Sequence, residues 1–423
     1  MSSELFQEEK MLLISMKKCD CNGESNYGQS LQRIMINRVV KRFQHTFQPY
    51  ETVLARLLSK PNEKFHLSRP LKAGDVINTG NGPIRHEDVI GKPYRSLVTT
   101  STSSSHQYML CKPSLEEYVV NKRREAQPIY PLDAGSIVQL SDVHADFPDM
   151  GLGPAIDVEK PTSFQKLHLS DEYDRFLHDR WENRRTQLPQ GLRTCAPPKQ
   201  YLECGTGHGS LTLQICRAIH SGNAYYDGND STRGSILHSL DRSAKHLVTG
   251  VKNLKHYDRG IYWTDVEFHL LSESEQGPSQ WLQGPTASYY RDVVGRLADR
   301  PGGFLNGAFL DLPSPQDHLE TIAQHLVAES PLMVFVPSIT QLWDCLQEVK
   351  TVGIPLSMTR VLELMSGSGG GGMREWDLRR TVIRETSKES MVARPKVGAR
   401  IVGGGFVGVF KKLPADSVVR TWK

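Results

Sequence analysis

The residues whose types and spacing could do chemistry are concentrated in the segment YLECGTGHGSLTL, residues 201–213. Glycines stand at positions 205, 207 and 209, and Glu203 lies two residues before the first of them. Glycines at alternate positions let a backbone approach a ligand closely and adopt conformations that other residues avoid. Because the segment begins with a strand-like run, the pattern predicts a ligand-binding loop at the end of a strand.

The spacing of these glycines favours one kind of adenosine ligand. A dinucleotide-binding loop has the pattern G-x-G-x-x-G and an acid about 20 residues later, whereas this loop reads G-x-G-x-G. No Gly-Lys-Ser/Thr follows, so the pattern excludes a P-loop that holds a nucleotide phosphate. A site for S-adenosylmethionine has no pyrophosphate to hold, and S-adenosylmethionine is therefore the expected cofactor.

Two aspartates end strand-like runs farther along the chain. Asp241 ends ILHSLDRS, where its carboxylate could accept hydrogen bonds from two ribose hydroxyls; a helix N-cap or a solvated acid is the alternative. Asp311 ends GAFLDLPSP, in which prolines stiffen the following turn. We expect the Asp311 carboxylate to face the reacting methyl group, with a turn-capping role as the alternative.

These side chains need a sheet that brings strand ends together, and residues 199–413 alternate between strand and helix patterns. Helical stretches such as HLETIAQHLVAE and QLWDCLQEVKTVG separate the strand candidates. The expected strands are 200–203, 236–240, 266–270, 307–311, 332–336, 360–364 and 405–410. This alternation predicts an α/β fold with a doubly wound, Rossmann-like sheet and a ligand at the carboxyl ends of its strands.

The rest of the chain divides by composition. Residues 1–68 read as a tail, in which the basic stretch from Gln32 to Lys60 has the composition of an organelle transit peptide or of a basic helix that lies on the protein or on RNA. Residues 69–113 read as a small β domain, and 114–413 as the catalytic domain. Within the latter, 114–145 predicts a helix, a turn and a helix with Ser114 as N-cap. Insertions are expected at 150–198 and 221–234, a flexible glycine-rich loop at 366–372, and a C-terminal tail at 414–423.

Composition narrows the classes of function. No stretch is long and apolar enough to cross a membrane, and the formal net charge is only +4. Any nucleic-acid surface must therefore be local. The seven cysteines show no paired CxxC spacing, which favours reduced thiols and predicts neither a metal site nor a disulfide framework.

Several separated segments resemble the tRNA adenine-N1 methyltransferases that modify the T-loop adenine at position 58 of tRNA. In chain order they are GPIRHEDVIGKP, YMLCKPSLEEYV, QPIYPLDAGSIV, YLECGTGHGSLTL, SLDRS, FLDLPSP, FVPSITQ and REWDLRR. They span residues 70–412, and the HEDVIG and LEEY motifs are far more specific than the glycine run. The likeness is strongest to the bacterial and mitochondrial branch, whose members are homo-oligomers, whereas the nuclear branch pairs a catalytic with a non-catalytic subunit.

The resemblance implies a class I methyltransferase fold and a set of site residues. Asp311 takes the position of the catalytic aspartate, and Tyr130 and Asp133 belong to a segment that closes over the site. The implied cofactor contacts are Glu203, Cys204, Gly205, Thr206, Gly207, His208, Gly209, Leu211, Thr212, Asp241, Arg242, Leu271, Ser272, Asp311, Tyr130 and Asp133. Two residues depart from the family pattern: His208 replaces a small residue, and Ser272 stands where an acid is common.

The resemblance also implies the reaction, which is methyl transfer from S-adenosylmethionine to N1 of adenine 58 in tRNA. We expect a mitochondrial homotetramer that binds tRNA, with a nuclear heterotetramer containing a non-catalytic subunit as the alternative. Candidate RNA contacts, which could equally be ordinary solvated charges, are Arg85, Lys92, Arg95, Arg374, Arg379 and Arg380. Two rival functions remain: a methyltransferase that acts on other RNA, protein or a small molecule, and a non-catalytic RNA-binding subunit.

Overall fold

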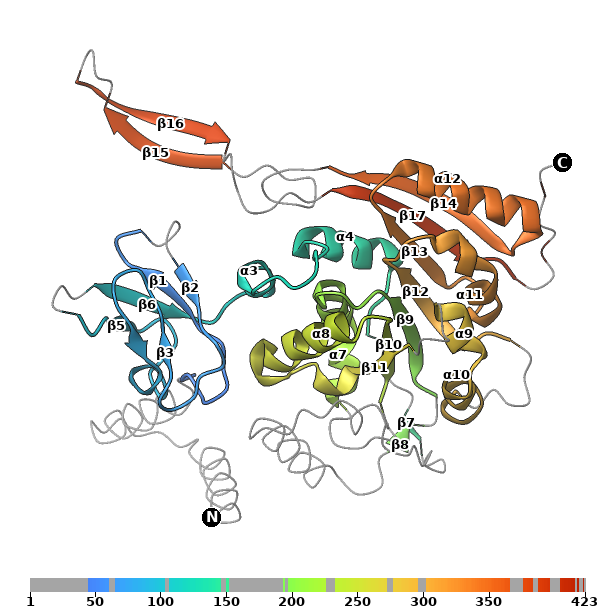
Figure 1. Ribbon diagram of the computed structural model, residues 1–423, viewed down its shortest axis with the longest axis horizontal. Coiled ribbons are helices and arrows are strands. Elements are labelled where there is room, and N and C mark those ends of the chain that lie inside the picture. The colour runs from blue at the N-terminus through green and yellow to red at the C-terminus, as the bar shows by residue number, and fades with distance from the viewer. Residues whose placement is uncertain are drawn as a thin grey trace, which may run out of the picture.

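The computed structural model describes residues 45–60, 65–102, 106–145, 150–151, 193–194, 197–225, 233–271, 277–295, 302–365, 376–382, 387–395, 404–414, 417 and 421. Figure 1 shows a small β domain joined through two helices to a larger part that is built on a central sheet, with a separate two-stranded hairpin. Several predictions lie outside the described residues: most of the insertion at 150–198, the glycine-rich loop at 366–372, Ser272 and Arg374.

The central sheet has seven strands in the order β11-β10-β9-β12-β13-β17-β14. The strands from β11 to β13 run parallel, and β17 lies antiparallel between β13 and β14. This architecture confirms the predicted α/β fold, and each of the seven expected strands is present with ends shifted by a few residues. The bounds are β9 (Lys199–Cys204), β10 (Ser235–Asp241), β11 (Val266–Leu270), β12 (Leu305–Leu310), β13 (Pro331–Val336), β14 (Leu356–Leu364) and β17 (Gly405–Lys412).

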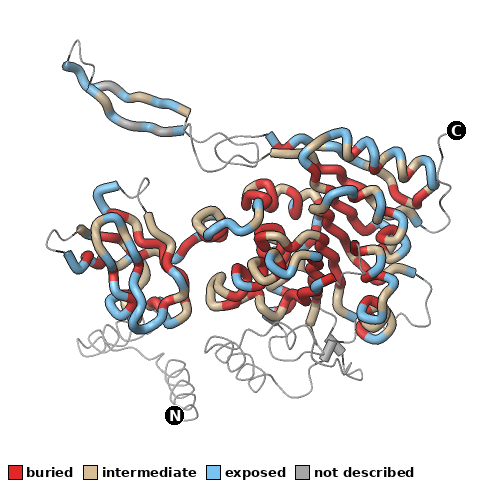
Figure 2. The backbone as a smooth tube through the Cα atoms, in the orientation of Figure 1, coloured by how far each residue is buried: buried red, intermediate tan, exposed pale blue. Residues whose placement is uncertain are grey.

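Helices cover both faces of this sheet, so its central strands are buried on both sides (Figure 2). One face packs against α4 (Pro131–Ser141), α7 (Ser210–Tyr225) and α8 (Ala244–His256). The other packs against α9 (Pro278–Gln283), α10 (Pro285–Tyr289), α11 (Leu319–His325) and α12 (Ile339–Glu348). Short helical turns are η1 (His86–Asp88), η3 (Tyr257–Arg259), η4 (Trp263–Asp265), η5 (Tyr290–Val294), η6 (Pro315–His318) and η7 (Val349–Gly353).

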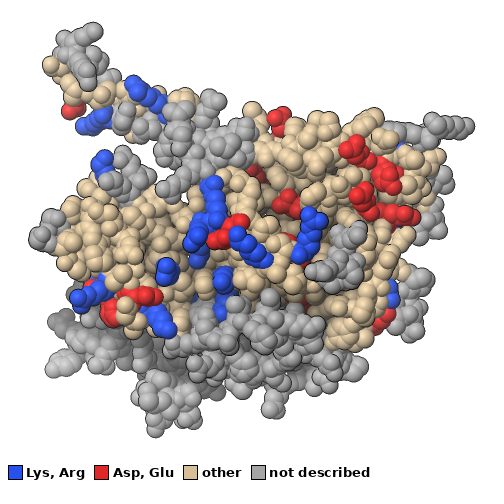
Figure 3. Space-filling view, in the orientation of Figure 1, with Lys and Arg blue, Asp and Glu red and all other residues tan. Residues whose placement is uncertain are grey.

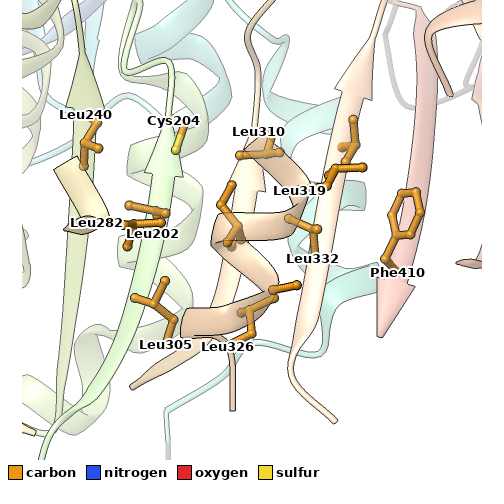
Figure 4. Close-up of a cluster of buried hydrophobic side chains, with 14 of the residues drawn as sticks. Leu202, Cys204, Leu240, Leu282, Leu305, Leu310, Leu319, Leu326, Leu332 and Phe410 are labelled. Carbon is orange, nitrogen blue, oxygen red and sulfur yellow. The ribbon is translucent and has the colours of Figure 1, made fainter. Parts of the chain in front are cut away.

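Alternation along β9 decides which of its side chains can reach the site. Leu202 and Cys204 join the apolar core beneath α9 and α11, as the close-up in Figure 4 shows. Tyr201 packs on the opposite side of the sheet, among residues of α4, α7 and α8. Since side chains alternate along a strand, Glu203 lies on the same side as Tyr201, towards the start of α7.

The small β domain begins earlier than its predicted boundary at residue 69. Its four-stranded sheet has the order β2-β1-β6-β5, and β1 (Leu54–Leu57) is an inner strand in which Leu54, Ala55 and Leu57 are buried. Arg56, which the sequence placed in a basic leader, pairs with Glu117 at the start of the helical link. The prediction of a tail to residue 68 is therefore wrong, because its basic residues obscured a short buried strand. The other strands are β2 (Phe65–Leu67), β3 (Val76–Ile77), β4 (Ile84–Arg85), β5 (Leu97–Thr99) and β6 (Gln107–Cys111).

The helical link between the two parts confirms the expected helix, turn and helix. Ser114 caps α3 (Leu115–Asn121) through a capping box with Glu117, and α4 follows. The link and the small domain attach to α8 and the turn after it: the Tyr118 hydroxyl donates to the Asn253 carbonyl at 2.7 Å, and the Thr52 hydroxyl donates to the His256 carbonyl at 2.9 Å.

Two pairs of strands lie outside the two larger sheets, and the boundary of one predicted insertion needs correction. The strands β7 (Met150–Gly151) and β8 (Arg193–Thr194) pair, and β15 (Trp376–Val382) and β16 (Glu389–Pro395) form the separate hairpin. The insertion predicted at 221–234 starts within a helix, because α7 continues to Tyr225. Among the described residues, no helix is long and apolar enough to cross a membrane and no cluster could hold a metal ion. The described cysteines, 111, 204, 216 and 345, are free thiols.

Candidate active site

The glycine loop connects β9 to α7, and its three glycines all have positive φ, at +100° for Gly205, +51° for Gly207 and +79° for Gly209. A Cβ on Gly205 would overlap with the backbone oxygen of Asp311, and a Cβ on Gly209 would lie 3.0 Å from the Gly250 Cα. A Cβ on Gly207 would meet no atom closer than 3.9 Å. Gly205 and Gly209 therefore serve packing within the protein, whereas Gly207 presents open space to a ligand.

Asp241 is fixed at the end of β10 by backbone donors. Its Oδ2 accepts from the Gly207 N–H at 2.9 Å, and its Oδ1 accepts from the Ser243 N–H at 2.8 Å. The N-cap of α8 is Ser243, so the alternative that Asp241 is a helix cap is wrong. Each carboxylate oxygen has a second lone pair. The carboxylate can therefore still accept hydrogen bonds from a ligand beside Gly207.

Asp311 follows β12, the neighbour of β9 on the side away from β10. Its N–H donates to the Cys204 carbonyl at 2.9 Å, which ties it to the residue before the glycine loop. In the described part of the chain its carboxylate has no hydrogen-bond or ion-pair partner, which argues against the turn-capping alternative. Burial, together with the charge of Asp241, raises the pKa of Asp311 to about 6. A carboxylate held in this way is disposed to accept a donor or stabilise a cation.

Glu203 lies beneath the loop and supports it. Its Oε2 accepts from the Thr212 hydroxyl at 2.7 Å and from the Ser239 hydroxyl at 2.6 Å, and Ser239 contacts the Thr206 hydroxyl at 2.7 Å. Its Oε1 has no partner among the described residues. Burial raises the pKa of this fully buried carboxyl to about 8, so it is mostly protonated at pH 7. Glu203 thus positions the loop through Ser239 and Thr206.

Several other predicted contacts face the core rather than the loop. The side chains of Cys204 and Leu271 lie in the core beneath α9, and that of Leu211 lies in the core on the opposite face. The buried His208 side chain lies beside Asn253, whose amide donates to the His208 carbonyl at 2.9 Å. The side chains of all four residues are buried. These residues were predicted to contact the cofactor, but the direction of their side chains was not predicted.

The segment before α4 lies beside the loop, as the resemblance implied. The Ser210 hydroxyl, at the start of α7, donates to the Ile129 carbonyl at 2.5 Å, and the neighbouring Tyr130 is the N-cap of α4. Asp133 is buried in the first turn of α4, where its Oδ2 accepts from the Gly404 N–H at 3.4 Å. This bond ties Asp133 to the start of β17, and Tyr130 is the residue of the pair nearer to the loop.

The predicted RNA contacts are spread over the small domain and the hairpin. Arg85 and Arg95 are exposed on the small domain, and Lys92 donates to the Leu97 carbonyl at 3.4 Å. On the hairpin, Arg380 lies 3.7 Å from Glu389. Arg379 belongs to β15, and Arg374 lies outside the described residues. These assignments remain predictions, and Figure 1 shows the hairpin standing apart from the central sheet.

One group of functional candidates was missed from the sequence. Lys122, Arg123 and Arg124 follow α3 and lie beside Lys245 and Lys252 of α8, on the side of the glycine loop. Two features of the sequence indicate this group of cations: the run KRR at 122–124, and the absence of any acid from residues 244–256. Only the fold brings the two segments together.

The fold is that of the class I S-adenosylmethionine-dependent methyltransferases. The strand order with one antiparallel strand, the loop after β9 and the acids after β10 and β12 belong to this class. The site fits the cofactor, since Gly207 leaves open space, Asp241 keeps free lone pairs and the buried Glu203 has an unpartnered oxygen. A solved structure of an S-adenosylmethionine-dependent O-methyltransferase from Thermotoga maritima superposes with a TM-score of 0.51 at 13% identity, covering 88% of this chain and 96% of that one.

Sequence comparison gives the particular family resemblance. The chain is 24% identical over 310 residues to the tRNA (adenine(58)-N(1))-methyltransferase TrmI of Thermus thermophilus, covering 73% of this chain and 82% of that protein. It is 31% identical over 100 residues, or 24% of that protein, to the tRNA (adenine(58)-N(1))-methyltransferase catalytic subunit TRM61 of Kluyveromyces lactis. No family model matches the chain. These relatives support the resemblance to the adenine-58 methyltransferases and do not distinguish its branches.

Proposed function

We propose that the protein transfers a methyl group from S-adenosylmethionine to N1 of adenine 58 in tRNA. The observation that carries the proposal is the Asp311 carboxylate, which has no hydrogen-bond or ion-pair partner among the described residues and whose backbone is held by Cys204 at the strand end next to the glycine loop. The similarity to the Thermus and Kluyveromyces enzymes supports the choice of tRNA as substrate. Together they favour this reaction over a methyltransferase that acts on a protein or a small molecule.

The chemistry needs few protein groups. When bound, S-adenosylmethionine supplies an electrophilic methyl group, and adenine N1 attacks it with its own lone pair, so no general base is required. Asp241 and the backbone at Gly207 would hold the cofactor. The adenine ring gains positive charge as the bond forms, and the Asp311 carboxylate can accept a hydrogen bond from the exocyclic amine and stabilise that charge. Because N1 lies on the Watson–Crick edge, the adenine must be unpaired or flipped out.

A direct test uses two tRNA transcripts, one with adenine and one with guanine at position 58. We expect the protein alone, or with a partner subunit, to incorporate one methyl group into the first transcript and none into the second, with N1-methyladenine identified by mass spectrometry. Methylation of both transcripts would move the target elsewhere in the RNA. Transfer to neither, together with calorimetric binding of S-adenosylmethionine, would indicate another substrate. Absence of cofactor binding would indicate a non-catalytic subunit.

We also propose that the protein acts in mitochondria, and the fold narrows where an import signal could lie. The basic stretch that suggested a transit peptide runs from Gln32 to Lys60, but Phe47 and the residues of β1 are buried in the small domain. A cleaved signal would therefore have to end before about residue 45. Fusing residues 1–44 to a fluorescent protein should direct it to mitochondria, and nuclear or diffuse fluorescence would count against this localisation.

We propose a homotetramer as the assembly. The expectation comes from the resemblance to the bacterial and mitochondrial branch. A heterotetramer is the alternative, because two of the relatives are described as catalytic subunits. Light scattering on the purified chain distinguishes the two. A tetramer that methylates tRNA without another protein supports the homo-oligomer, whereas an inactive chain that gains activity with a second subunit supports the heteromer.

A further inference from the structure

A group of cations borders the glycine loop, where the chain leaves α3 and passes α8. Lys122, Arg123 and Arg124 follow α3 directly, and Lys245 and Lys252 lie on α8. All but Lys122 are exposed. Figure 3 shows Lys and Arg side chains gathered between α3 and α8, in the middle of this face. We call these residues the junction patch.

Among the described residues, Glu125 is the acid that forms ion pairs with the junction patch, and the five cations outnumber it. The Arg123 Nε atom is 3.3 Å from Glu125 Oε1, and the Lys245 Nζ atom is 3.2 Å from Oε2. A hydrogen bond from Lys245, followed by the charges of Lys245, Arg123 and Lys252, lowers the pKa of Glu125. One carboxylate cannot neutralise both Arg123 and Lys245. The α8 segment, residues 244–256, contributes no acid of its own.

The patch lies next to the site. The Arg124 guanidinium is 5.5 Å from the ring centroid of Tyr130, the residue that lies beside the loop. Burial lowers the pKa of His208 in the loop, and the positive charges of Lys122 and Arg124 lower it further. Lys245 is in the first turn of α8, two residues after Ser243, whose N–H donates to Asp241. An anion bound at the patch would therefore lie close to Asp241 and the loop.

We propose that the junction patch binds the phosphate backbone of the RNA substrate and holds the RNA beside the methyl-transfer site. The nature of the ligand rests on the proposed function. Several cations spread over two separate elements match a polyanion better than a single charged group, and arginine binds phosphate in a two-pronged geometry.

A pair of matched variants tests the patch. In the first, Lys245→Gln is combined with Lys252→Gln. In the control, Lys350→Gln is combined with Arg360→Gln on η7 and β14, at the opposite end of the strand order from β11. Both remove two positive charges. We expect fluorescence titration with a labelled tRNA transcript, without cofactor, to give a Kd at least about fivefold higher for the patch variant than for the parent. The slope of the logarithm of the affinity against the logarithm of the salt concentration should fall by the equivalent of about one to two phosphate contacts. The control should stay within about twofold of the parent.

A third variant predicts a change of opposite sign. Glu125→Gln removes the acid from the patch and should strengthen tRNA binding by about two- to threefold, because phosphates are no longer repelled. A purely structural role for Glu125 and its partners predicts no gain. Parent-like affinity and salt dependence in the double variant would overturn the proposal, as would weaker binding by Glu125→Gln. Tighter binding of a polyglutamate peptide than of tRNA would also overturn it, in favour of an acidic protein partner.

The proposal and the proposed function fail in different ways. If the parent methylates adenine 58 and the patch variant binds and methylates tRNA as well as the parent does, the patch is not the RNA contact and the proposed function stands. If tRNA binding depends on the patch but no methyl group reaches adenine 58, the proposed function is wrong, and the patch remains an RNA-binding surface.

Discussion

The backbone carbonyl oxygen of Asp311 occupies the space where a side chain on Gly205 would begin. The ends of β9 and β12 lie side by side here, and the Asp311 N–H donates to the Cys204 carbonyl oxygen. The residue expected to stabilise the reacting adenine is therefore positioned by the first residue of the cofactor loop. Gly205 therefore has a packing role that Gly207 does not have, and substitutions can separate the roles of the two glycines.

Gly205→Ala should damage the fold at the site, whereas Gly207→Ala should leave the fold intact and weaken cofactor binding. The first places a methyl group into the Asp311 backbone, and the second projects one into open space at a φ of +51°. Alanine at such a φ costs on the order of 1–2 kcal/mol. Calorimetry should show at least about tenfold weaker S-adenosylmethionine binding for Gly207→Ala, with a midpoint of thermal unfolding only about 2–6 °C below that of the parent. Unchanged affinity in a folded Gly207 variant would place the cofactor elsewhere.

Asp311→Asn should slow methyl transfer by about a hundredfold or more while cofactor and tRNA affinities stay within a few-fold of the parent. Asparagine keeps the shape and one oxygen acceptor but lacks the negative charge that stabilises the forming adenine cation. Single-turnover kinetics with saturating S-adenosylmethionine isolate this step. A rate near that of the parent would reduce Asp311 to a structural residue of the turn.

The raised pKa of Asp311 predicts a pH dependence that the same variant should abolish. Because the ionised form is the active one and its pKa is about 6 in the free protein, kcat/KM should rise with pH through that value and then level off. The ascending limb should be missing from Asp311→Asn. If both proteins show the same limb, another group in the protein or in the RNA is responsible.

Glu203→Gln should make stability less dependent on pH between about 4.5 and 8. The folded-state pKa of about 8 lies above the ordinary value of 4.5, so the folded protein holds a proton that the unfolded chain releases in this window. Parent stability therefore falls as pH rises through the window, by on the order of 3 kcal/mol by pH 7. Urea midpoints at pH 5.5 and 8 should shift in favour of the Gln variant at the higher pH. The exposed Glu363→Gln should show no such shift.

The buried pair His238 and His269 predicts the opposite trend at acid pH. Their rings lie 3.2 Å apart between nitrogens, and burial lowers both pKa values, that of His269 to about 3. Below pH 6.5 the two histidines bind protons in the unfolded chain but not in the folded protein. The free energy of unfolding should therefore fall as the pH decreases below this value. At pH 5 this amounts to about 2 kcal/mol for His269, and the lowered pKa of His238 adds to the loss of stability in the same direction. His269→Gln should resist acid better than the parent, relative to their stabilities at pH 7.5.

The sequence was sufficient where the signals are local. The glycine spacing, the acids at strand ends and the alternation of strands and helices each lie within one segment, and they led to the loop, Asp241 and Asp311. Local signals failed at β1, where Arg56 hid a buried strand, and at Cys204 and Leu211, where the phase of the strand or helix turns the side chain into the core.

The junction patch shows the other limit. Residues 122–124 and α8 are separated by more than a hundred positions, and neither is unusual by itself. Their meeting depends on Tyr118 binding the Asn253 carbonyl, a contact that no local pattern encodes. Where a surface is assembled from distant segments, charge counted along the chain does not reveal it.

The chain of contacts through α8 has a thermodynamic consequence. Tyr118 of the link holds α8 at Asn253, Asn253 holds the carbonyl of His208, and Gly250 of the same helix abuts Gly209. The proposed RNA contacts on the link and the proposed cofactor contacts on the loop are thus joined through one helix. If tRNA changes the affinity for S-adenosylmethionine through this helix, the cofactor must change the affinity for tRNA by the same factor. The demethylated cofactor product has lost the sulfonium charge, so the affinity of the protein for the RNA would then differ before and after methyl transfer. Release of this product and release of the RNA would therefore be linked.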